Sequence, residues 1–589
     1  MKLLRKLFYT GCFSIALTSS AVASEMALCQ HEERDSAALR AQAARPVHWR
    51  NLNARKPVDW VQFKILGIND FHGQLESSSL FGSPVGGAEV LASYLRAETK
   101  ESSVGAFIVH AGDHVGASPP ASALLQDEPS ISFLNLLSRN CDPDNKLAPR
   151  CNLVGTLGNH EFDEGVDEML RLLNGGNHAD GPFLEDEYGG ARFPYVNANV
   201  VYKDGGEPVL PPYVIKKVRG QSVAFIGAVL KDTPTIVTPS GVAGVEFLDE
   251  ADAINSYVPE LLARGVRAIV VTIHQGARQS FNGGPTPEEL RDLSGAIGDI
   301  VNRLDDEVDI VISGHAHGFT NQLVKNQNGH PILVTQAFSR GSAYADIDVA
   351  IDPQSGDIVQ KSASIITTWA NQTPGTNKQK DVASLVSASV NAVAPLVNEV
   401  VGIAASAITR AETAAGESAL GNLIADAQRQ AMGTEVAFMN PGGIRADMEA
   451  GEVTWGELFT IQPFNNDLVK MELTGTQILA LLEQQWLNQS RPRVLKTSGI
   501  EYTWDAGQPD GSKVIPDSVL VNGIALDENT VYSLTVNSFI AGGGDNFSVL
   551  TEGDNRVVGP VDLDALISFI QNLEQPFSAT TEGRIQVLD

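Results

Sequence analysis

The sequence is poor in positive charge. It holds 42 Lys and Arg against 71 Asp and Glu, which gives a formal net charge of −29. A protein that binds the phosphate backbone of nucleic acids needs a basic surface, so this balance argues against a nucleic-acid partner. A small anionic substrate is compatible with it, because bound metal ions supply positive charge locally.

Long hydrophobic runs are also missing. Near the N-terminus, three cations precede a short apolar stretch over residues 7–17, and Ala21-Val22-Ala23 has the small-residue pattern of a cleavage site. We therefore predict that residues 1–23 are a signal peptide and that the protein is periplasmic or secreted. The remaining apolar runs have the length of strands, so no membrane span is expected.

Cysteine is scarce, with four in the whole chain. Cys12 lies in the predicted signal peptide. Export permits disulfides, and Cys141 and Cys151 flank a short polar loop, so we expect them to form a local disulfide. Cys29 is left over without a role. No CxxC or Cys/His spacing is present, which excludes a thiolate zinc site.

The length of 589 residues indicates at least two domains. Residues 24–59 form a polar N-terminal extension. Residues 60–370 alternate short Val- and Ile-rich runs with helical patterns, which predicts an α/β domain. Residues 371–400 form a linker with a helical stretch, 381–400, that is a candidate hinge, and residues 401–589 form a second, smaller domain.

Five of the predicted strands lead into loops that carry metal-binding residue types. In chain order these residues are Asp70 and His72, Asp113, Asn159 and His160, His274, and His315 and His317. Singly, an aspartate after a strand is often a helix cap, and a lone histidine is often a hydrogen-bonded bystander. Together they indicate one site, because open α/β sheets gather ligands at the carboxyl ends of their strands.

These residue types suit two divalent ions. Imidazole and carboxylate groups without thiolates are compatible with Zn, Mn or Co. Two ions held by a bridging carboxylate stabilise charge on a phosphoryl group, and one of them activates water for attack as hydroxide. The pattern therefore predicts metal-dependent hydrolysis of a phosphate ester.

The motifs resemble those of a known family. In the first half, Asp-x-His, GD, GNHE and GHxH resemble the calcineurin-type metallophosphoesterases. In the second half, GNLIADA (421–427), NPGGIR (440–445), QPF (462–464) and NSFIAGGGDNF (537–547) resemble the 5′-nucleotidase C-terminal domain. The resemblance implies a four-layer α/β/β/α domain followed by a smaller α+β domain. Its family includes the periplasmic 5′-nucleotidase/UDP-sugar hydrolases.

The resemblance also implies roles for the metal-binding residues. The first ion would be held by Asp70, His72, Asp113 and His317, and the second by Asp113, Asn159, His274 and His315. His160 would be the catalytic histidine, with Asp163 orienting it. The periplasmic enzyme has glutamine where this chain has His317. His110 and His114 match no ligand position and are expected in the core or behind the ligands.

Substrate residues follow from the same resemblance. Phe464 and Phe539 would stack on a nucleobase, Asp545 would bind the ribose hydroxyls, and Asn440 would contact the base or sugar. Arg445 would bind the phosphate, for which a guanidinium fork is suited. One departure is that the arginines usual before GNL are missing, and Arg410 is the nearest candidate.

The predicted function is that of an exported dimetal phosphohydrolase that releases phosphate from nucleotides by attack of metal-bound hydroxide. Two enzymatic alternatives stay open: a 2′,3′-cyclic-nucleotide phosphodiesterase or UDP-sugar pyrophosphatase, and a broad phosphomonoesterase. A nucleotide-binding protein without turnover is an alternative of another class. The expected partner is a small nucleotide, with no nucleic acid and no membrane. The oligomeric state is not predicted.

Overall fold

The computed structural model describes residues 60–588 except 81, 102–104, 281–283 and 288–292. The predicted signal peptide, the N-terminal extension and Cys29 lie outside the described residues. None of the helices in the described ranges combines the length and apolarity needed to cross a membrane.

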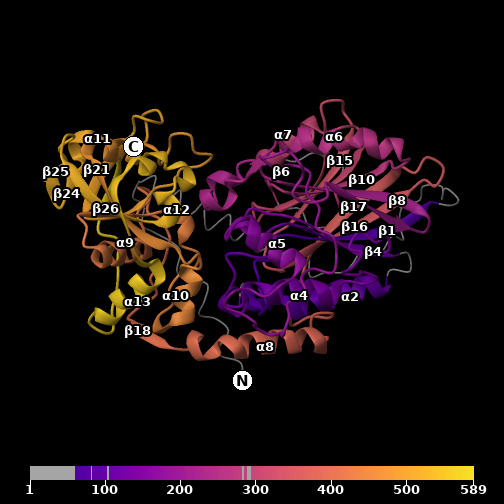
Figure 1. Ribbon diagram of the computed structural model, residues 1–589, viewed down its shortest axis with the longest axis horizontal. Coiled ribbons are helices and arrows are strands. Elements are labelled where there is room, and N and C mark those ends of the chain that lie inside the picture. The colour runs from indigo at the N-terminus through magenta and orange to yellow at the C-terminus, as the bar shows by residue number, and fades with distance from the viewer. Residues whose placement is uncertain (1–59, 81, 102–104, 281–283, 288–292, 589) are drawn as a thin grey trace, which may run out of the picture.

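The N-terminal half contains two large sheets (Figure 1). The five-stranded sheet has the order β17 (Ile358–Thr367), β16 (Ala343–Ile351), β1 (Val61–Ile68), β4 (Ala106–Ala111) and β5 (Leu153–Thr156). The six-stranded sheet has the order β14 (Phe319–Lys325), β15 (Pro331–Ala337), β13 (Val308–Ser313), β10 (Ala268–His274), β8 (Gln221–Val229) and β7 (Tyr213–Val218). Strands β1, β4 and β5 are parallel, as are β8, β10, β13 and β15.

The two sheets pack face to face, and helices cover both outer faces. Along β1, Phe63 and Ile65 enter the core between the sheets, whereas Leu66 and Ile68 face the helical layer, as the two-residue period of a strand requires. The first sheet is covered by α2 (Ala88–Glu101), α4 (Glu128–Leu137) and α5 (Val166–Asn174), and the second by α6 (Glu250–Ala263) and α7 (Ala296–Arg303). The predicted four-layer α/β/β/α fold is confirmed.

The disulfide between Cys141 and Cys151 is confirmed. Cys151 is buried beside β5, and the bridge closes the loop that begins after α4. Within this loop the carbonyl of Ala148 accepts a hydrogen bond from Lys216 Nζ at 3.0 Å. The disulfide closes this polar loop, and Lys216 of the edge strand β7 holds it against the N-terminal half.

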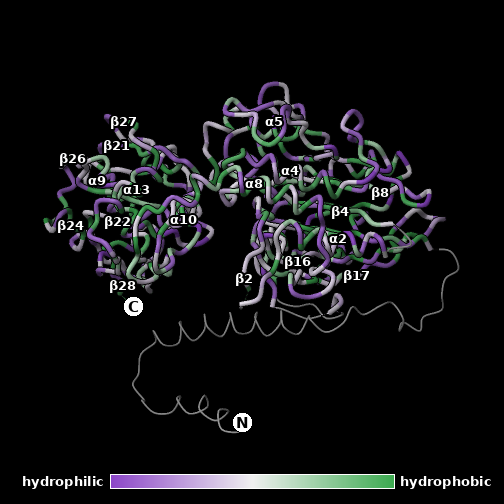
Figure 2. The backbone as a smooth tube through the Cα atoms, turned by 90° about the horizontal axis from the view of Figure 1, so that it is seen from below, coloured by the Kyte–Doolittle hydropathy of each residue, from purple (hydrophilic) through white to green (hydrophobic). Residues whose placement is uncertain are grey.

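The two halves are connected by α8 (Lys380–Val397). Val382 and Val393 pack into the core of the N-terminal half, and Val397 lies against Gly456 of α10 (Trp455–Ile461) in the C-terminal half. Figure 2 shows α8 where the two lobes meet. The helix was expected to reach residue 400, but it ends at Val397. The chain after it enters β18 (Val400–Ala404), which pairs with β20 (Gly451–Thr454).

The C-terminal half is built on one mixed sheet, which confirms its α+β class. The strand order is β22 (Lys496–Ser498), β19 (Val436–Met439), β26 (Val531–Asn537), β21 (Asp467–Thr474) and β27 (Asp554–Val561). Helices α9 (Ala419–Met432) and α13 (Asp562–Asn572) share one hydrophobic cluster, and α11 (Gly475–Glu483) packs in another. Ser418 caps α9 by accepting from Gly421 N, and Gly433 ends it in the left-handed conformation. A small sheet, β25 (Ile524–Ala525), β24 (Leu520–Val521), β23 (Ile500–Asp505) and β28 (Ile585–Leu588), completes this half.

Candidate active site

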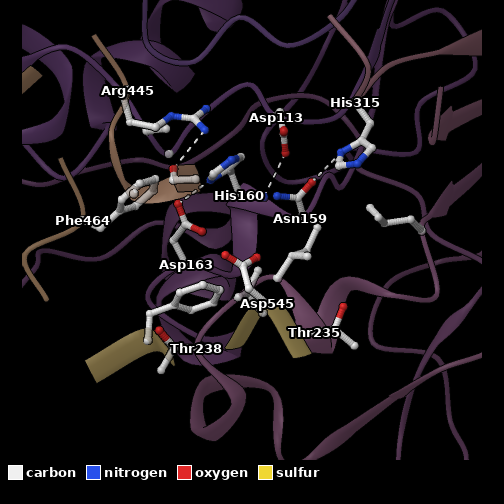
Figure 3. A pocket seen from close by; sticks show the side chains of 18 of the residues that line it. Asp113, Asn159, His160, Asp163, Thr235, Thr238, His315, Arg445, Phe464 and Asp545 are labelled. Carbon is white, nitrogen blue, oxygen red and sulfur yellow. Dashed lines mark hydrogen bonds and ion pairs between the residues drawn. The ribbon is translucent and has the colours of Figure 1, made fainter. Parts of the chain in front are cut away.

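The predicted metal ligands converge at the carboxyl ends of β1, β4, β5, β10 and β13, where the two sheets meet. Two groups of side chains have ligand atoms within 4.8 Å of one another: Asp70, His72 and His317, and Asp113, His274 and His315. His72, Asp113 and His160 form a third such group. Asn159 joins the second group, because its Oδ1 lies 3.0 Å from His315 Nδ1 (Figure 3).

Asp113 lies between the two groups. Its Oδ2 is 2.9 Å from His274 Nε2 and 3.8 Å from His72 Nε2. On the other side of His72, the His317 Nε2 atom is 3.0 Å from His72 Nε2 and 3.2 Å from Asp70 Oδ1. Asp113, which faces both His274 and His72, therefore has the position that a bridging carboxylate needs.

The imidazole orientations fit bound cations. The Nδ1 atoms of His72 and His274 lie 2.8 and 2.7 Å from the carbonyl oxygens of Gly116 and Ala111, so each Nδ1 carries the proton and donates it. In the neutral tautomer each Nε2 then presents a lone pair toward Asp70 or Asp113. A lone pair facing a carboxylate is unfavourable unless a cation lies between them, and backbone carbonyls commonly orient metal-binding histidines in this way. The donor set thus fits two divalent ions.

The backbone of the site is strained. Five predicted ligands have positive φ although none is glycine: Asp70 (49°), His72 (49°), Asp113 (49°), His315 (69°) and His317 (50°). Such conformations are uncommon outside glycine and persist where surrounding contacts enforce them. Gly158 is one of those contacts, because a Cβ on it would lie 2.2 Å from Asp113 Oδ1. The loops are therefore held in conformations that aim the ligands inward.

Glu161, for which the sequence predicted no role, holds two of these loops together. Its carboxylate accepts hydrogen bonds from the backbone N–H groups of Asp113 (2.9 Å), His114 (2.8 Å) and Gly158. Burial and the nearby charge of Asp113 raise the pKa of this carboxyl to about 7, against the opposing effect of the N–H donors. The signal was present in the GNHE motif, where Glu161 directly follows His160.

His160 and Asp163 adopt the arrangement that their sequence context predicts. His160 Nδ1 lies 2.7 Å from Asp163 Oδ2, and the His160 backbone N–H donates to Asp113 Oδ1 at 2.9 Å. Burial acts to lower the pKa of His160, but Asp163 and Asp113 outweigh it and the pKa is raised. Because Asp163 binds Nδ1, the Nε2 edge of the imidazole is left for other partners.

A cavity of about 1750 Å³ adjoins this cluster and is lined by both halves of the chain. The N-terminal half contributes Asp113, Asn159, His160, Asp163, His315, His317 and Arg340, and the C-terminal half Arg410, Asn440, Arg445, Phe464, Phe539 and Asp545. Asp70, His72 and His274 are buried and contact the lining residues Asp113 and His317. The substrate residues predicted from the sequence are thus brought into one cavity with the metal-binding residues.

The contacts of these substrate residues differ from a simple open clamp. Phe464 stacks on His160, and the guanidinium of Arg445 lies 5.8 Å from the centroid of the Phe464 ring. Phe539 is half-buried and packs partly into the core of the C-terminal half. Arg410 donates through Nη1 to the carbonyl of Ile444 at 3.2 Å.

The polar residues of the C-terminal motifs form one chain of hydrogen bonds. Asn537 donates to Asn440, and Asn440 donates to Asp545, each over 2.9 Å. Asp545 also pairs with Arg493, with Nη1 and Oδ1 2.5 Å apart. Arg493 belongs to none of the sequence motifs, so its contact with Asp545 is known only from the fold. His110 and His114 are buried and contact each other's rings, as expected of core residues.

The fold and this site define a metal-dependent phosphoesterase. Residues 63–319 match the calcineurin-like phosphoesterase family, and residues 397–552 match the 5′-nucleotidase C-terminal domain. The chain is 34% identical to the cell wall protein Lmo0130 of Listeria monocytogenes, over 90% of this chain and 70% of that protein. It therefore belongs to the calcineurin-like phosphoesterases that carry a 5′-nucleotidase C-terminal domain, and it is a phosphoric ester hydrolase.

Two further similarities agree with this assignment. The chain is 37% identical to endonuclease YhcR of Bacillus subtilis, over 90% of this chain but only 41% of that longer protein. The crystal structure of a 5′-nucleotidase precursor from Thermus thermophilus superposes with a TM-score of 0.71 at 29% identity, covering 90% of this chain and 99% of that one.

Proposed function

We propose that the protein is a 5′-nucleotidase-like enzyme that hydrolyses nucleotides and releases phosphate. The observation that carries this proposal is the shared cavity, which joins the histidine and aspartate cluster of one half to two aromatic side chains of the other. A flat π surface accepts a nucleobase, whereas the metal-binding cluster accepts a phosphoryl group. The similarity to the Thermus 5′-nucleotidase precursor supports the same substrate class.

The metal-binding residues in this proposal are Asp70, His72, Asp113, Asn159, His274, His315 and His317. When bound, two divalent ions (Zn, Mn or Co) would supply positive charge to the phosphoryl oxygens and activate the attacking water. Asp163 accepts the Nδ1 proton of His160 and, with Asp113, raises the pKa of the imidazole, so that the imidazolium form carries a second proton on Nε2 to donate toward the leaving oxygen. Glu161 keeps the Asp113 and Gly158 loops in register.

The C-terminal half would select the substrate. Phe464 and Phe539 stack on the base, and the Asn440–Asp545 pair binds the sugar or the base edge. Arg445 and Arg410 bind the phosphate, since guanidinium groups form charge-assisted hydrogen bonds with it. Residues 60–370 and 401–589 would form the two domains, with residues 371–400 and α8 as the hinge between them.

A phosphodiester substrate is the second candidate. It is favoured by the 37% identity to a protein named as an endonuclease, although this chain spans less than half of that relative. A 2′,3′-cyclic nucleotide would offer the cluster a phosphodiester, and a UDP-sugar would offer it a pyrophosphate bridge. We also propose export through residues 1–23, a location in keeping with the cell wall protein among the relatives.

The test is phosphate release by the mature, metal-stripped protein after addition of Zn²⁺, Mn²⁺, Co²⁺ or Mg²⁺. The substrates are AMP, ATP, UDP-glucose, 2′,3′-cyclic AMP, glycerol phosphate and p-nitrophenyl phosphate, with a coupled phosphatase for the diesters. Metal-dependent preference for AMP or ATP is the expected result. Equal activity on glycerol phosphate would contradict a base-binding role for the aromatic residues and favour a broad phosphomonoesterase.

A further inference from the structure

Arg340 lies in the connection that crosses from the six-stranded sheet to the five-stranded sheet, between β15 and β16. Its backbone N–H donates to the carbonyl of Asp70 at 2.7 Å, and its carbonyl accepts from Gly87 N–H at 3.5 Å. The backbone of Arg340 is therefore tied directly to a loop that carries a predicted metal ligand. Its side chain lines the cavity.

Two arginines of the C-terminal half line the same cavity. Arg445 is anchored through its N–H to the carbonyl of Ile461 at 2.8 Å, and Arg410 through its N–H to Asp447 Oδ1, also at 2.8 Å. In the described part of the chain, Arg340 and Arg445 form no ion pair. Asp447 Oδ1 is 4.0 Å from Arg410 Nε, and the charges of Asp163 and Asp113 act to raise the pKa of Arg445 without forming an ion pair with it.

The three arginines line one cavity, and their charges act on one another. Burial lowers the pKa of Arg340, and the charge of Arg410 lowers it further. Burial also lowers the pKa of Arg445, followed by the charge of Arg340. In a chain with a net charge of −29, Arg340 and Arg445 thus line the cavity without an ion pair in the described part of the chain, beside Arg410, whose Nε is 4.0 Å from Asp447.

We infer that Arg340, Arg410 and Arg445 form one binding site for a doubly charged terminal phosphate, with Arg340 supplied by the catalytic half. Rows of guanidinium donors bind phosphate oxygens by charge-assisted hydrogen bonds. A phosphate monoester carries close to two negative charges at neutral pH, whereas a diester carries one. The site therefore favours monoesters over diesters, and it replaces the arginines that are missing before GNL.

This inference rests on the proposed function for its substrate, but its test does not need a nucleotide. p-Nitrophenyl phosphate and methyl p-nitrophenyl phosphate share a leaving group and differ by one charge. We expect Arg340→Gln to lower kcat/KM for the monoester at least about tenfold and that for the diester less than about threefold. Arg278→Gln is the matched control, because Arg278 lines the same cavity on β11 (Arg278–Gln279), and it should change the two values alike.

A binding measurement tests the site without turnover. Calorimetric titration of the metal-free protein with inorganic phosphate should show binding that is at least about tenfold weaker in Arg340→Gln. Arg340→Lys, which keeps the charge but loses the fork, should be intermediate. Equal phosphate affinity in wild type and Arg340→Gln, or an equal loss on both nitrophenyl esters, would overturn the inference. Failure of nucleotide preference alone would overturn only the base-binding proposal.

Discussion

Phe464 of the C-terminal half stacks on His160 of the N-terminal half, with ring centroids 5.9 Å apart and planes inclined by 11°. One face of the aromatic side chain that we assign to base binding is thus covered by the histidine that we assign to catalysis. A base can use that face only after the two rings separate. Stacking of a base on that face therefore requires movement of the Phe464 loop or of one half against the other.

Removal of the aromatic rings should weaken nucleotide binding selectively. We expect Phe464→Ala and Phe539→Ala each to raise KM for AMP about tenfold, since base–aromatic stacking contributes about 1–3 kcal/mol. KM for p-nitrophenyl phosphate should change much less in both variants. Steady-state kinetics with the two substrates measures the difference, and an unchanged KM for AMP in both variants would exclude the stacking role.

His274→Ala should abolish binding of at least one ion. His274 is fully buried against Asp113, so its loss leaves the second group of ligands incomplete. We expect activity with added metal to fall at least about 100-fold. Bound metal is measured by elemental analysis together with phosphate release. His330→Ala, which alters a histidine outside the cluster, is the control. Full turnover of His274→Ala would show that the dimetal assignment is wrong.

His160→Ala should keep its metal and lose rate. We expect kcat to fall about 100- to 10,000-fold while the bound metal stays at the wild-type level, because the side chain acts on the reacting groups. Asp163→Asn should lower kcat by a smaller factor, about tenfold, since it leaves the imidazole in place while it weakens its orientation and lowers its pKa. Loss of bound metal in His160→Ala would instead make His160 a ligand, as the third group of side chains also permits.

Glu161→Gln should destabilise the loops that carry Asp113 and Gly158. The new amide would present N–H atoms to backbone N–H groups that now donate to the carboxylate. We expect the free energy of unfolding to fall by about 1–3 kcal/mol and the metal affinity to fall with it. Denaturant unfolding with and without metal measures both. Glu187→Gln, at an exposed carboxylate, serves as the control and should change neither quantity.

The buried Lys216 should make the free energy of unfolding depend on pH in the alkaline range. Burial lowers its pKa from 10.5 to about 8, so between these values the unfolded chain binds more protons than the folded one. Stability then rises with pH across this window, by up to about 3 kcal/mol. Below pH 8 the folded protein retains the buried charge and lacks this gain. The difference between wild type and Lys216→Met, followed by chemical unfolding from pH 7 to 10.5, should show the rise, and a flat difference would contradict it.

The sequence is informative where chemistry and chain order coincide. The sequence could place Asp113 just after one strand and His274 at the end of another, and strand ends are where α/β folds gather ligands. These strands, β4 and β10, belong to different sheets, so the contact between the two residues also depends on how the sheets pack. The position of Arg340 in the cavity could not be predicted, because it depends on how the chain crosses from one sheet to the other. Arg493 likewise reaches Asp545 only through folding of the C-terminal half. The end of α8 was misplaced because the pairing of β18 with β20, a long-range contact, overrides the local helical pattern.

The cavity has walls from two halves that each possess a separate hydrophobic core. Loops of the C-terminal half can therefore vary in sequence without disturbing the packing that aims Asp113 and its neighbours. In such an arrangement the metal-binding residues can stay constant while the residues of the C-terminal half that contact the rest of the substrate change. A chimera that keeps residues 60–400 and takes its remaining residues from a relative should inherit the base preference of that relative, together with the metal requirement of this chain and the contribution of Arg340.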